Sequence, residues 1–178
     1  MSKELQMKRW KESVCNWSPW VSGGVLGITM VAQIGLSFIL CNPSALPVLK
    51  WLGYVVWTLS AIFGIVPMIT FRVKGRVPKG NSYMHTTVLV DSGIYAVVRH
   101  PQFLAGVLIS IALTLITQHW LIAILGAVSA GVTYLDALRA DQDGIEKFGA
   151  EYECYMQRVP RLNFVAGLLR LAFRDGGG

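Results

Sequence analysis

Charge-free apolar stretches alternate with short polar breaks along the chain, and they predict its membrane helices. Residues 20–41 and 51–71 each lack charged side chains and are long enough to cross the roughly 30 Å hydrocarbon core of a bilayer as a helix. Asn42-Pro43 closes the first stretch, and Pro43 and Pro47 bracket a tight turn before the second. The two stretches therefore predict a transmembrane hairpin.

A second, shorter pair of apolar stretches follows later in the chain. Residues 103–117 and 120–135 are separated only by Gln118-His119. Each arm is short for a full span, so we expect a close helix hairpin that is tilted or locally thins the bilayer. The second arm is expected to continue as helix past the membrane surface toward residues 148–149. Between the hairpins, residues 72–101 carry five Lys or Arg side chains and cannot lie in lipid.

The distribution of charge predicts the orientation of these helices. The chain is 53% hydrophobic and 15% charged, against about 25% charged in soluble domains, so it lacks the polar surface of a water-soluble globule. Of its 16 Lys and Arg residues, only Lys50 lies in a hairpin turn. Because cytoplasmic segments collect Lys and Arg, we expect four crossings with both termini and the central loop in the cytoplasm.

The expected fold class is all-α: a polytopic membrane protein with about four transmembrane helices in two hairpins. At the N-terminus, Met7, Trp10, Val14 and Trp17 share one face of a helix opposite basic side chains, which predicts an interfacial cytoplasmic helix. A C-terminal cytoplasmic helical cap is expected after the fourth crossing. No linker divides the 178 residues, so they are expected to form a single domain over residues 1–178.

Composition also argues against some classes of partner. The three cysteines have no CxxC spacing and indicate neither a disulfide framework nor a metal site. The net charge is +6, but the basic residues flank apolar segments instead of alternating with stacking aromatics. We therefore expect contacts with membrane lipids, no nucleic acid and no metal.

Polar residues gather in two segments on the expected cytoplasmic side, residues 86–106 and 136–161. In the first, Arg99-His100-Pro101 opens the third membrane helix. Proline suits the first helical turn and holds the preceding residue extended, so His100 lies at a helix N-terminus, where free N–H groups favour anions. From these residues alone, an interfacial anchor for lipid phosphate remains an equal alternative.

In the second segment, acidic and basic side chains crowd just beyond the fourth crossing. A solvated helix with an i,i+3 pair between Asp136 and Arg139 is the plain interpretation. Phe148, Tyr152 and Tyr155 recur at helical spacing and suit packing as well as a binding site. Spacing alone leaves these alternatives open.

Two motifs in these segments resemble those of the isoprenylcysteine carboxyl methyltransferases. Residues 93–103 resemble the family's G-x-Y-x-x-x-R-H-P-x-Y segment, and residues 148–160 resemble its F-G-x-x-Y-x-x-Y-x-x-R-V-P ending. The resemblance covers roughly the C-terminal half of the chain, and it places the catalytic part at residues 80–165. It implies a methyltransferase that uses S-adenosylmethionine, bound at the cytoplasmic face, and a lipophilic acceptor from the bilayer, such as a prenylcysteine-type carboxylate or a related lipid or prenylated peptide.

The resemblance also implies site residues. Arg99 and Arg139 are the candidates for orienting an anionic acceptor, and Asp141 for holding charged amino or ribose groups of the cofactor. The remaining implied cofactor contacts are Thr87, Val88, Leu89, Val90, Tyr95, His100, Pro101, Gln102 and Phe103.

Several positions depart from the family pattern. Ala140 and Asp141 stand where the family has paired glutamates, and Asp136 stands at the position of its substrate-contacting arginine. Gly144 replaces a leucine, and Phe103 replaces the second tyrosine of the first motif. These departures bear on the carboxyl acceptor more than on the cofactor.

Two other classes remain open from the sequence. NADPH-dependent sterol and steroid reductases carry similar R-H-P and tyrosine-containing patterns, although they usually have more than four crossings. A small non-catalytic membrane scaffold is the third alternative, and Ala140 and Gly144 are its best support.

Overall fold

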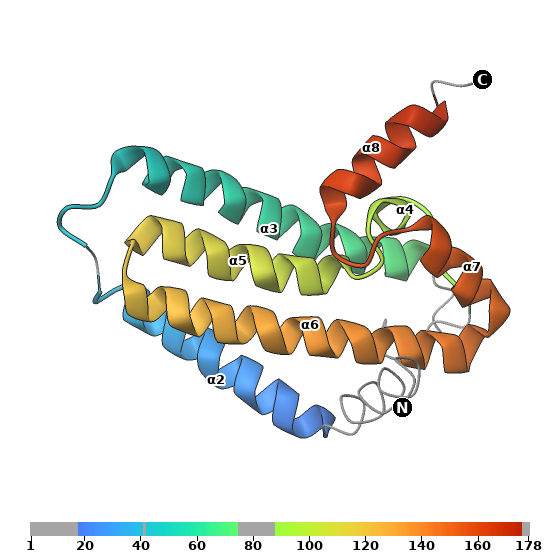
Figure 1. The fold of residues 1–178 in the computed structure, drawn as a ribbon, viewed down its shortest axis with the longest axis horizontal. Helices are drawn as coiled ribbons and strands as arrows, with labels where there is room; N and C mark the ends of the chain where they lie inside the picture. Colours follow the sequence, from blue (N-terminus) through green and yellow to red (C-terminus); the bar gives the residue numbers. More distant parts are fainter. Residues whose placement is uncertain (1–17, 41, 75–87, 176–178) are drawn as a thin grey trace, which may run out of the picture.

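The computed structural model describes residues 18–40, 42–74 and 88–175, and these residues form helices and connecting segments without strands (Figure 1). The expected interfacial helix in residues 1–17 lies outside the described residues. The helices, labelled as in Figure 1, are α2 (Pro19–Ser37), α3 (Pro47–Lys74), α4 (Ile94–Val97), α5 (Pro101–Thr117), α6 (Trp120–Phe148), α7 (Ala150–Arg158) and α8 (Phe164–Asp175).

The four long helices pack in the order α3–α5–α6–α2, which differs from their order in the chain (Figure 1). α5 and α6 form the expected close hairpin, whereas α2 packs on α6 and α3 packs on α5. The second hairpin thus lies between the two arms of the first. The all-α polytopic fold predicted from the sequence is confirmed, with α2, α3 and α6 long and apolar enough to cross a membrane and α5 shorter at 17 residues.

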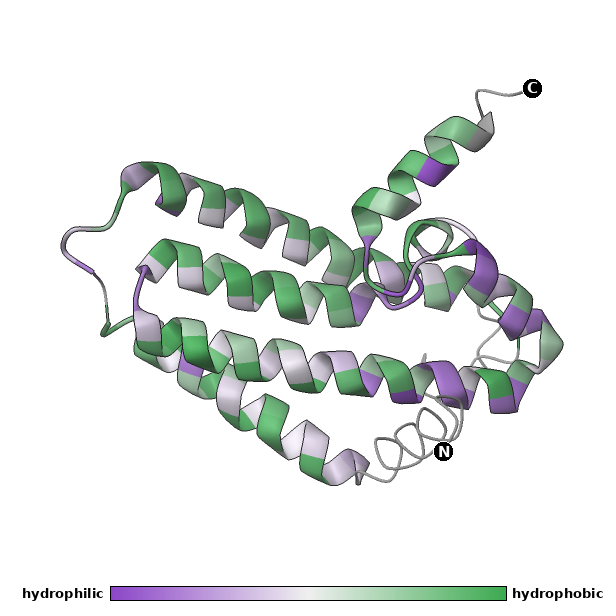
Figure 2. Cartoon of the chain, viewed as in Figure 1, coloured by the Kyte–Doolittle hydropathy of each residue, from purple (hydrophilic) through white to green (hydrophobic). Residues whose placement is uncertain are grey.

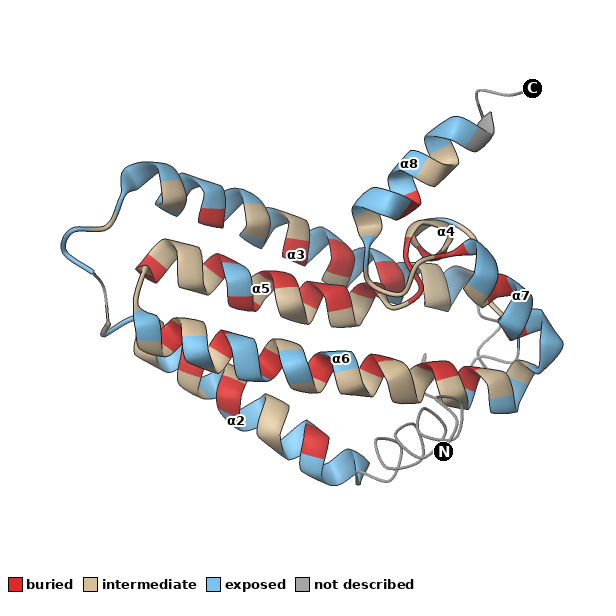
Figure 3. Cartoon of the chain, viewed as in Figure 1, coloured by how far each residue is buried: buried red, intermediate tan, exposed pale blue. Residues whose placement is uncertain are grey.

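In α2 the polar side chains are buried and the apolar side chains are exposed, which is the reverse of a helix in a water-soluble protein (Figures 2 and 3). Its buried residues are Ser22, Thr29 and Gln33, all polar. Apolar side chains point outward instead, with Trp20 90% and Val31 73% exposed. Lipid accepts such a surface, and polar side chains between helices replace the hydrophobic driving force that is missing there.

Polar contacts hold the bundle together between its helices. The Gln33 amide donates to the backbone carbonyls of Ser110 on α5 (3.1 Å) and Ile122 on α6 (3.2 Å). The Ser129 hydroxyl donates to Thr29 Oγ1 at 2.8 Å, which joins α6 to α2. Each of these contacts satisfies a buried polar group that lipid would leave without a partner.

The turns at one end of the bundle are joined by Gln118, which ends α5 in the left-handed region at φ 49°. Its side chain accepts from the Leu46 N–H and donates to the Leu46 carbonyl, both at 2.9 Å. The Asn42 N–H donates to the Thr117 carbonyl at 3.2 Å. The predicted break at residues 118–119 is therefore confirmed, and it also ties the two hairpin turns to each other.

At the opposite end, α6 continues well beyond the apolar stretch, as predicted, and ends at Gly149 with φ 57°. α7 then folds back as a short helical cap, and α8 runs away from the bundle (Figure 1). Gly167 lets α8 approach the α4 backbone, because a Cβ there would collide with the Val97 carbonyl. This end of the molecule carries both motif segments.

Candidate active site

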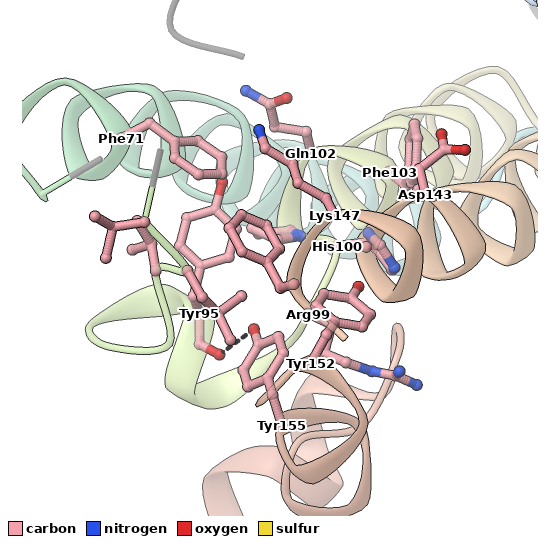
Figure 4. A pocket seen from close by; sticks show the side chains of 17 residues that line it. Phe71, Tyr95, Arg99, His100, Gln102, Phe103, Asp143, Lys147, Tyr152 and Tyr155 are labelled. Atoms are coloured by element: carbon pink, nitrogen blue, oxygen red, sulfur yellow. Dashed lines mark hydrogen bonds between the residues drawn. The ribbon is translucent and has the colours of Figure 1, made fainter. Parts of the chain in front are cut away.

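The two motif segments, about sixty residues apart in the chain, are joined by backbone hydrogen bonds. The N–H groups of Arg99 and His100 donate to the carbonyls of Pro160 (3.0 Å) and Arg161 (3.2 Å), respectively. The Tyr155 hydroxyl, on α7, donates to the Tyr95 carbonyl on α4 at 2.7 Å (Figure 4). The predicted convergence of the two segments at one end of the bundle is confirmed.

A cavity of about 280 Å³ lies where these segments meet α3 and α6 (Figure 4). Its wall is mostly aromatic and aliphatic, with a few charged and amide groups, which is the usual composition of a small-molecule site. It is lined by Phe71, Val88, Leu89, Val90, Tyr95, Arg99, His100, Pro101, Gln102, Phe103, Ala140, Asp143, Gly144, Lys147, Phe148, Tyr152 and Tyr155.

Most of the residues predicted as cofactor contacts line this cavity. Eight of the ten do so, while Thr87 lies outside the described residues and Asp141 is absent from the lining. The cofactor roles of these residues remain predictions. Those that line it are Val88, Leu89, Val90, Tyr95, His100, Pro101, Gln102 and Phe103.

Asp141 lies behind the cavity wall and is 2% exposed. Its Oδ1 accepts from Arg99 Nη1 (3.1 Å), His100 Nε2 (2.7 Å) and the Tyr152 hydroxyl (3.0 Å). Its Oδ2 accepts from Arg161 Nε at 2.6 Å. An ionised carboxylate only accepts, so His100 Nε2 carries a proton. The geometry makes Asp141 a positioning residue that fixes the side chains around it.

Arg139 faces a different part of the molecule from the cavity. Its Nη1 donates to Asp136 Oδ1 at 3.0 Å and to the Ser22 hydroxyl of α2 at 3.3 Å. The predicted i,i+3 pair is therefore present, but it belongs to the contact between α6 and α2. Of the two predicted catalytic arginines, Arg99 lines the cavity and Arg139 does not.

Buried donors without an acceptor are present in the cavity wall. Arg99 Nε and Gln102 Nε2 have no hydrogen-bond partner within the described part of the chain. His100 caps α5, with Pro101 in the first turn as predicted, and the N–H groups of Gln102 and Phe103 have no acceptor within the helix. Because unpaired buried donors are costly, this wall suits a ligand rich in acceptor atoms, such as a carboxylate or a nucleoside.

Tyr152 and Tyr155 stay neutral in this setting. Burial raises the pKa of the Tyr152 phenol, and the adjacent Asp141 carboxylate raises it further. Burial likewise raises the pKa of Tyr155, with a further contribution from Tyr152. Both hydroxyls therefore remain hydrogen-bond donors over the physiological range of pH, one to Asp141 and the other to the Tyr95 carbonyl.

The α6 face of the cavity was missed by the sequence analysis. Ala140, Asp143, Gly144 and Lys147 line it, and their spacing of three and four residues marks one side of a helix. That periodicity was visible in the sequence, but charged residues on a helix beyond the membrane are equally typical of a solvated surface. Phe71, Phe148, Tyr152 and Tyr155 complete the unpredicted lining.

Gly144 is the position on α6 against which the Tyr152 ring packs. A Cβ at Gly144 would collide with that ring. The glycine that replaces the family's leucine therefore lets the Tyr152 hydroxyl reach Asp141. Gly144 therefore has a structural role in this site, and it does not support the alternative of a non-catalytic scaffold.

The described residues thus form an all-helical bundle with a cavity at one end, and residues of both motif segments line that cavity. The family model for phospholipid methyltransferases matches residues 48–140, which are just over half of the chain and span α3 to most of α6. The chain belongs to this family, as the resemblance to membrane methyltransferases predicted. No curated protein and no solved structure matches it significantly.

Proposed function

We propose that this protein transfers a methyl group from S-adenosylmethionine to a lipophilic acceptor that enters from the bilayer. The observation that carries the proposal is the cavity in which both family motifs meet, with unpaired donors in its wall. When bound, S-adenosylmethionine supplies an electrophilic methyl group on a sulfonium. Membership of the methyltransferase family supports this chemistry over reductase or scaffold functions.

The first turn of α5 is proposed to hold the acceptor atoms of the cofactor. His100 Nε2 is fixed by Asp141, which sets the orientation of the imidazole ring at the cavity. The N–H groups of Gln102 and Phe103, which have no acceptor within the helix, and the Gln102 amide extend this donor surface.

Aromatic side chains on the other side of the cavity exclude water. Phe71 of α3 and Tyr95 of α4 pack with ring centroids 4.6 Å apart, and Phe103 and Phe148 also line the wall. Methyl transfer to a nucleophile that is already ionised, such as a carboxylate, needs little acid–base help. Most of the rate is therefore expected from alignment of the reactants and from removal of water.

Arg99 is the residue proposed to orient an anionic acceptor. Its Nη1 is engaged by Asp141, while its unpaired Nε belongs to a cavity-lining residue. A prenylcysteine-type carboxylate or a lipid phosphate would accept from such a group. Arg139 pairs with Asp136 and does not line the cavity, so this role is not proposed for it.

The identity of the methyl donor is tested by comparing the binding of S-adenosylmethionine with the binding of NADPH. S-adenosylmethionine should raise the Tm of the purified protein, whereas NADPH should not, because a ligand stabilises only the state it binds. His100→Ala and Asp141→Ala should remove this stabilisation. Wild-type affinity in both variants would remove the assignment of the site. Labelled S-adenosylmethionine, incubated with total lipid extract and a farnesyl-cysteine panel, then identifies the acceptor.

The proposed orientation places this site in the cytoplasm. Cys154 of α7 is an exposed free thiol at the site end of the bundle. In a Cys15→Ser/Cys41→Ser variant, a membrane-impermeant maleimide should label Cys154 only after the cells are permeabilised. Adding Ser44→Cys in the opposite turn provides the control, which should be labelled in intact cells. The reverse pattern would overturn the orientation.

A further inference from the structure

We propose that Asp143 and Lys147 together form a clamp for the zwitterionic amino-acid end of the methyl donor. This inference rests on the proposed function and names the residues that recognise one part of its cofactor. Both residues lie on α6, and both line the cavity. Neither belongs to the sequence motifs, and neither was assigned a role by the resemblance.

The two side chains are one helical turn apart and carry opposite charges. Residues four apart on a helix lie on the same face, with Cβ atoms about 6 Å from each other. Within the described part of the chain, the Asp143 carboxylate has no hydrogen-bond or ion-pair partner. The Lys147 Nζ lies 5.2 Å from the Phe148 ring centroid and likewise has no ion-pair partner there. The cavity edge thus presents a carboxylate and an ammonium that are available to a ligand.

The nearby acids are already committed to other contacts. Asp141 accepts four hydrogen bonds behind the wall, and Asp136 pairs with Arg139 away from the cavity. Asp143 is therefore the acidic residue among the described residues that line the cavity. A cationic group of any ligand held here meets Asp143 as its carboxylate partner.

An α-amino acid matches this pair because its ammonium and carboxylate sit on one carbon atom. The ammonium would donate to Asp143, and the carboxylate would accept from Lys147. Figure 4 shows Lys147 extended toward Gln102, with Asp143 on the other side, beside Phe103, so the flexible Lys147 side chain would have to turn back toward Asp143 to hold both groups of one ligand. The aromatic wall is left for the uncharged nucleoside.

The test uses ligands that differ in the amino-acid end alone. S-adenosylmethionine and S-adenosylhomocysteine both carry it, and 5′-methylthioadenosine lacks it. Asp143→Asn and Lys147→Gln should each weaken binding of the first two by about tenfold in Kd, because each removes a hydrogen bond to a charged group. Binding of 5′-methylthioadenosine should be unchanged. Isothermal calorimetry on the full-length protein measures all three.

Matched variants separate this effect from loss of structure. Glu146→Gln removes a neighbouring exposed charge of α6 that does not line the cavity, and it should leave all three affinities unchanged. Asp143→Glu should retain most of the affinity. Because Asp143 has no ion-pair or hydrogen-bond partner among the described residues, Asp143→Asn should leave the Tm of the ligand-free protein at the wild-type value.

The outcomes distinguish this inference from the proposed function. If the wild-type protein binds neither adenosyl ligand, the proposed function fails and the inference fails with it. If the wild-type protein binds them and the two variants bind equally well, the clamp alone is wrong. The clamp is also wrong if the variants weaken the binding of 5′-methylthioadenosine to the same extent. It is wrong as well if they change only the KM for the acceptor lipid.

Discussion

The carboxylate of Asp141 accepts a 2.6 Å hydrogen bond from Nε of Arg161, which follows it by twenty residues. The same carboxylate holds Arg99 and His100, so both motif segments meet on a single buried acid. Arg161 also reaches the Tyr134 hydroxyl at 3.2 Å, and this contact ties the segment after α7 back to the middle of α6. The order of the cavity wall therefore depends on a residue that does not line it.

Removing the charge of Asp141 should destabilise the fold as well as the site. Asp141→Asn leaves Arg99 and Arg161 without their counter-charge, and breaking a buried ion pair in this way costs about 3 kcal/mol. We expect a Tm lower by several degrees in thermal denaturation. Asp91→Asn is the control, because Asp91 and Arg158 are 3.7 Å apart and about half exposed, so its effect should be below about 1 kcal/mol. Equal effects of the two variants would contradict the central role of Asp141.

Adding one methyl group at Gly144 should disturb the site from the back. The new Cβ would displace the Tyr152 ring, and overpacking of this kind costs about 1–3 kcal/mol. Gly144→Ala should lower the Tm and weaken binding of S-adenosylhomocysteine. Gly131→Ala on the same helix, where nothing lies within 4 Å, should leave both intact. A Tyr152→Ala background should abolish the penalty, and a penalty that persists there would show another cause.

Gln33 should contribute more to the stability of the helix bundle than its apolar neighbours on α2 do. Gln33→Ala removes two hydrogen bonds that join α2 to the backbones of α5 and α6. Polar contacts between membrane helices contribute about 0.6–1.7 kcal/mol, so a measurable loss of stability in detergent or bicelles is expected. Val31→Ala, which trims a side chain that is 73% exposed, should have little effect. The opposite ranking would show that α2 is held by its outer surface.

The stability of the protein should fall in alkaline solution, in part through Tyr152. Its pKa is raised in the folded protein, so it stays neutral where tyrosines of the unfolded chain ionise, above about pH 10. The stability it contributes is complete below that pH and is lost as the pH rises toward the folded pKa. Tyr152→Phe should be less stable near neutrality but should lose stability less steeply between about pH 9 and 11. Tm curves that run parallel for the two proteins would contradict this.

Helix positions could be predicted from the sequence, whereas helix neighbours could not. The break at Gln118, the extension of α6 and the cap at His100 all follow from charge, length and proline rules. The insertion of α5 and α6 between α2 and α3 does not, since the apolar stretches of all four long helices look alike and the preference for partners depends on scattered small and polar residues. Gln33 was visible only as the most polar member of its stretch.

The motif side of the cavity could likewise be predicted, but its α6 side could not. Tyr95 and His100 belong to a recognisable sequence motif. Asp143 and Lys147 do not, and such charged residues are typical of any solvated helix. The inward orientation of Asp141 depends on Arg161, a contact between segments whose register no local rule sets. Predicting its role from sequence would have required the path of the chain after α7.

The contacts of Asp141 also constrain how the molecule is made. Arg99 and His100 precede this acid in the chain, whereas Tyr152 and Arg161 follow it and leave the ribosome later. Both hairpins also precede Tyr152, so the four long helices are released before half of the hydrogen bonds to the acid can form. Completion of the cavity wall is therefore a late step of folding, and a protein truncated after α6 would keep the four long helices but lack that wall.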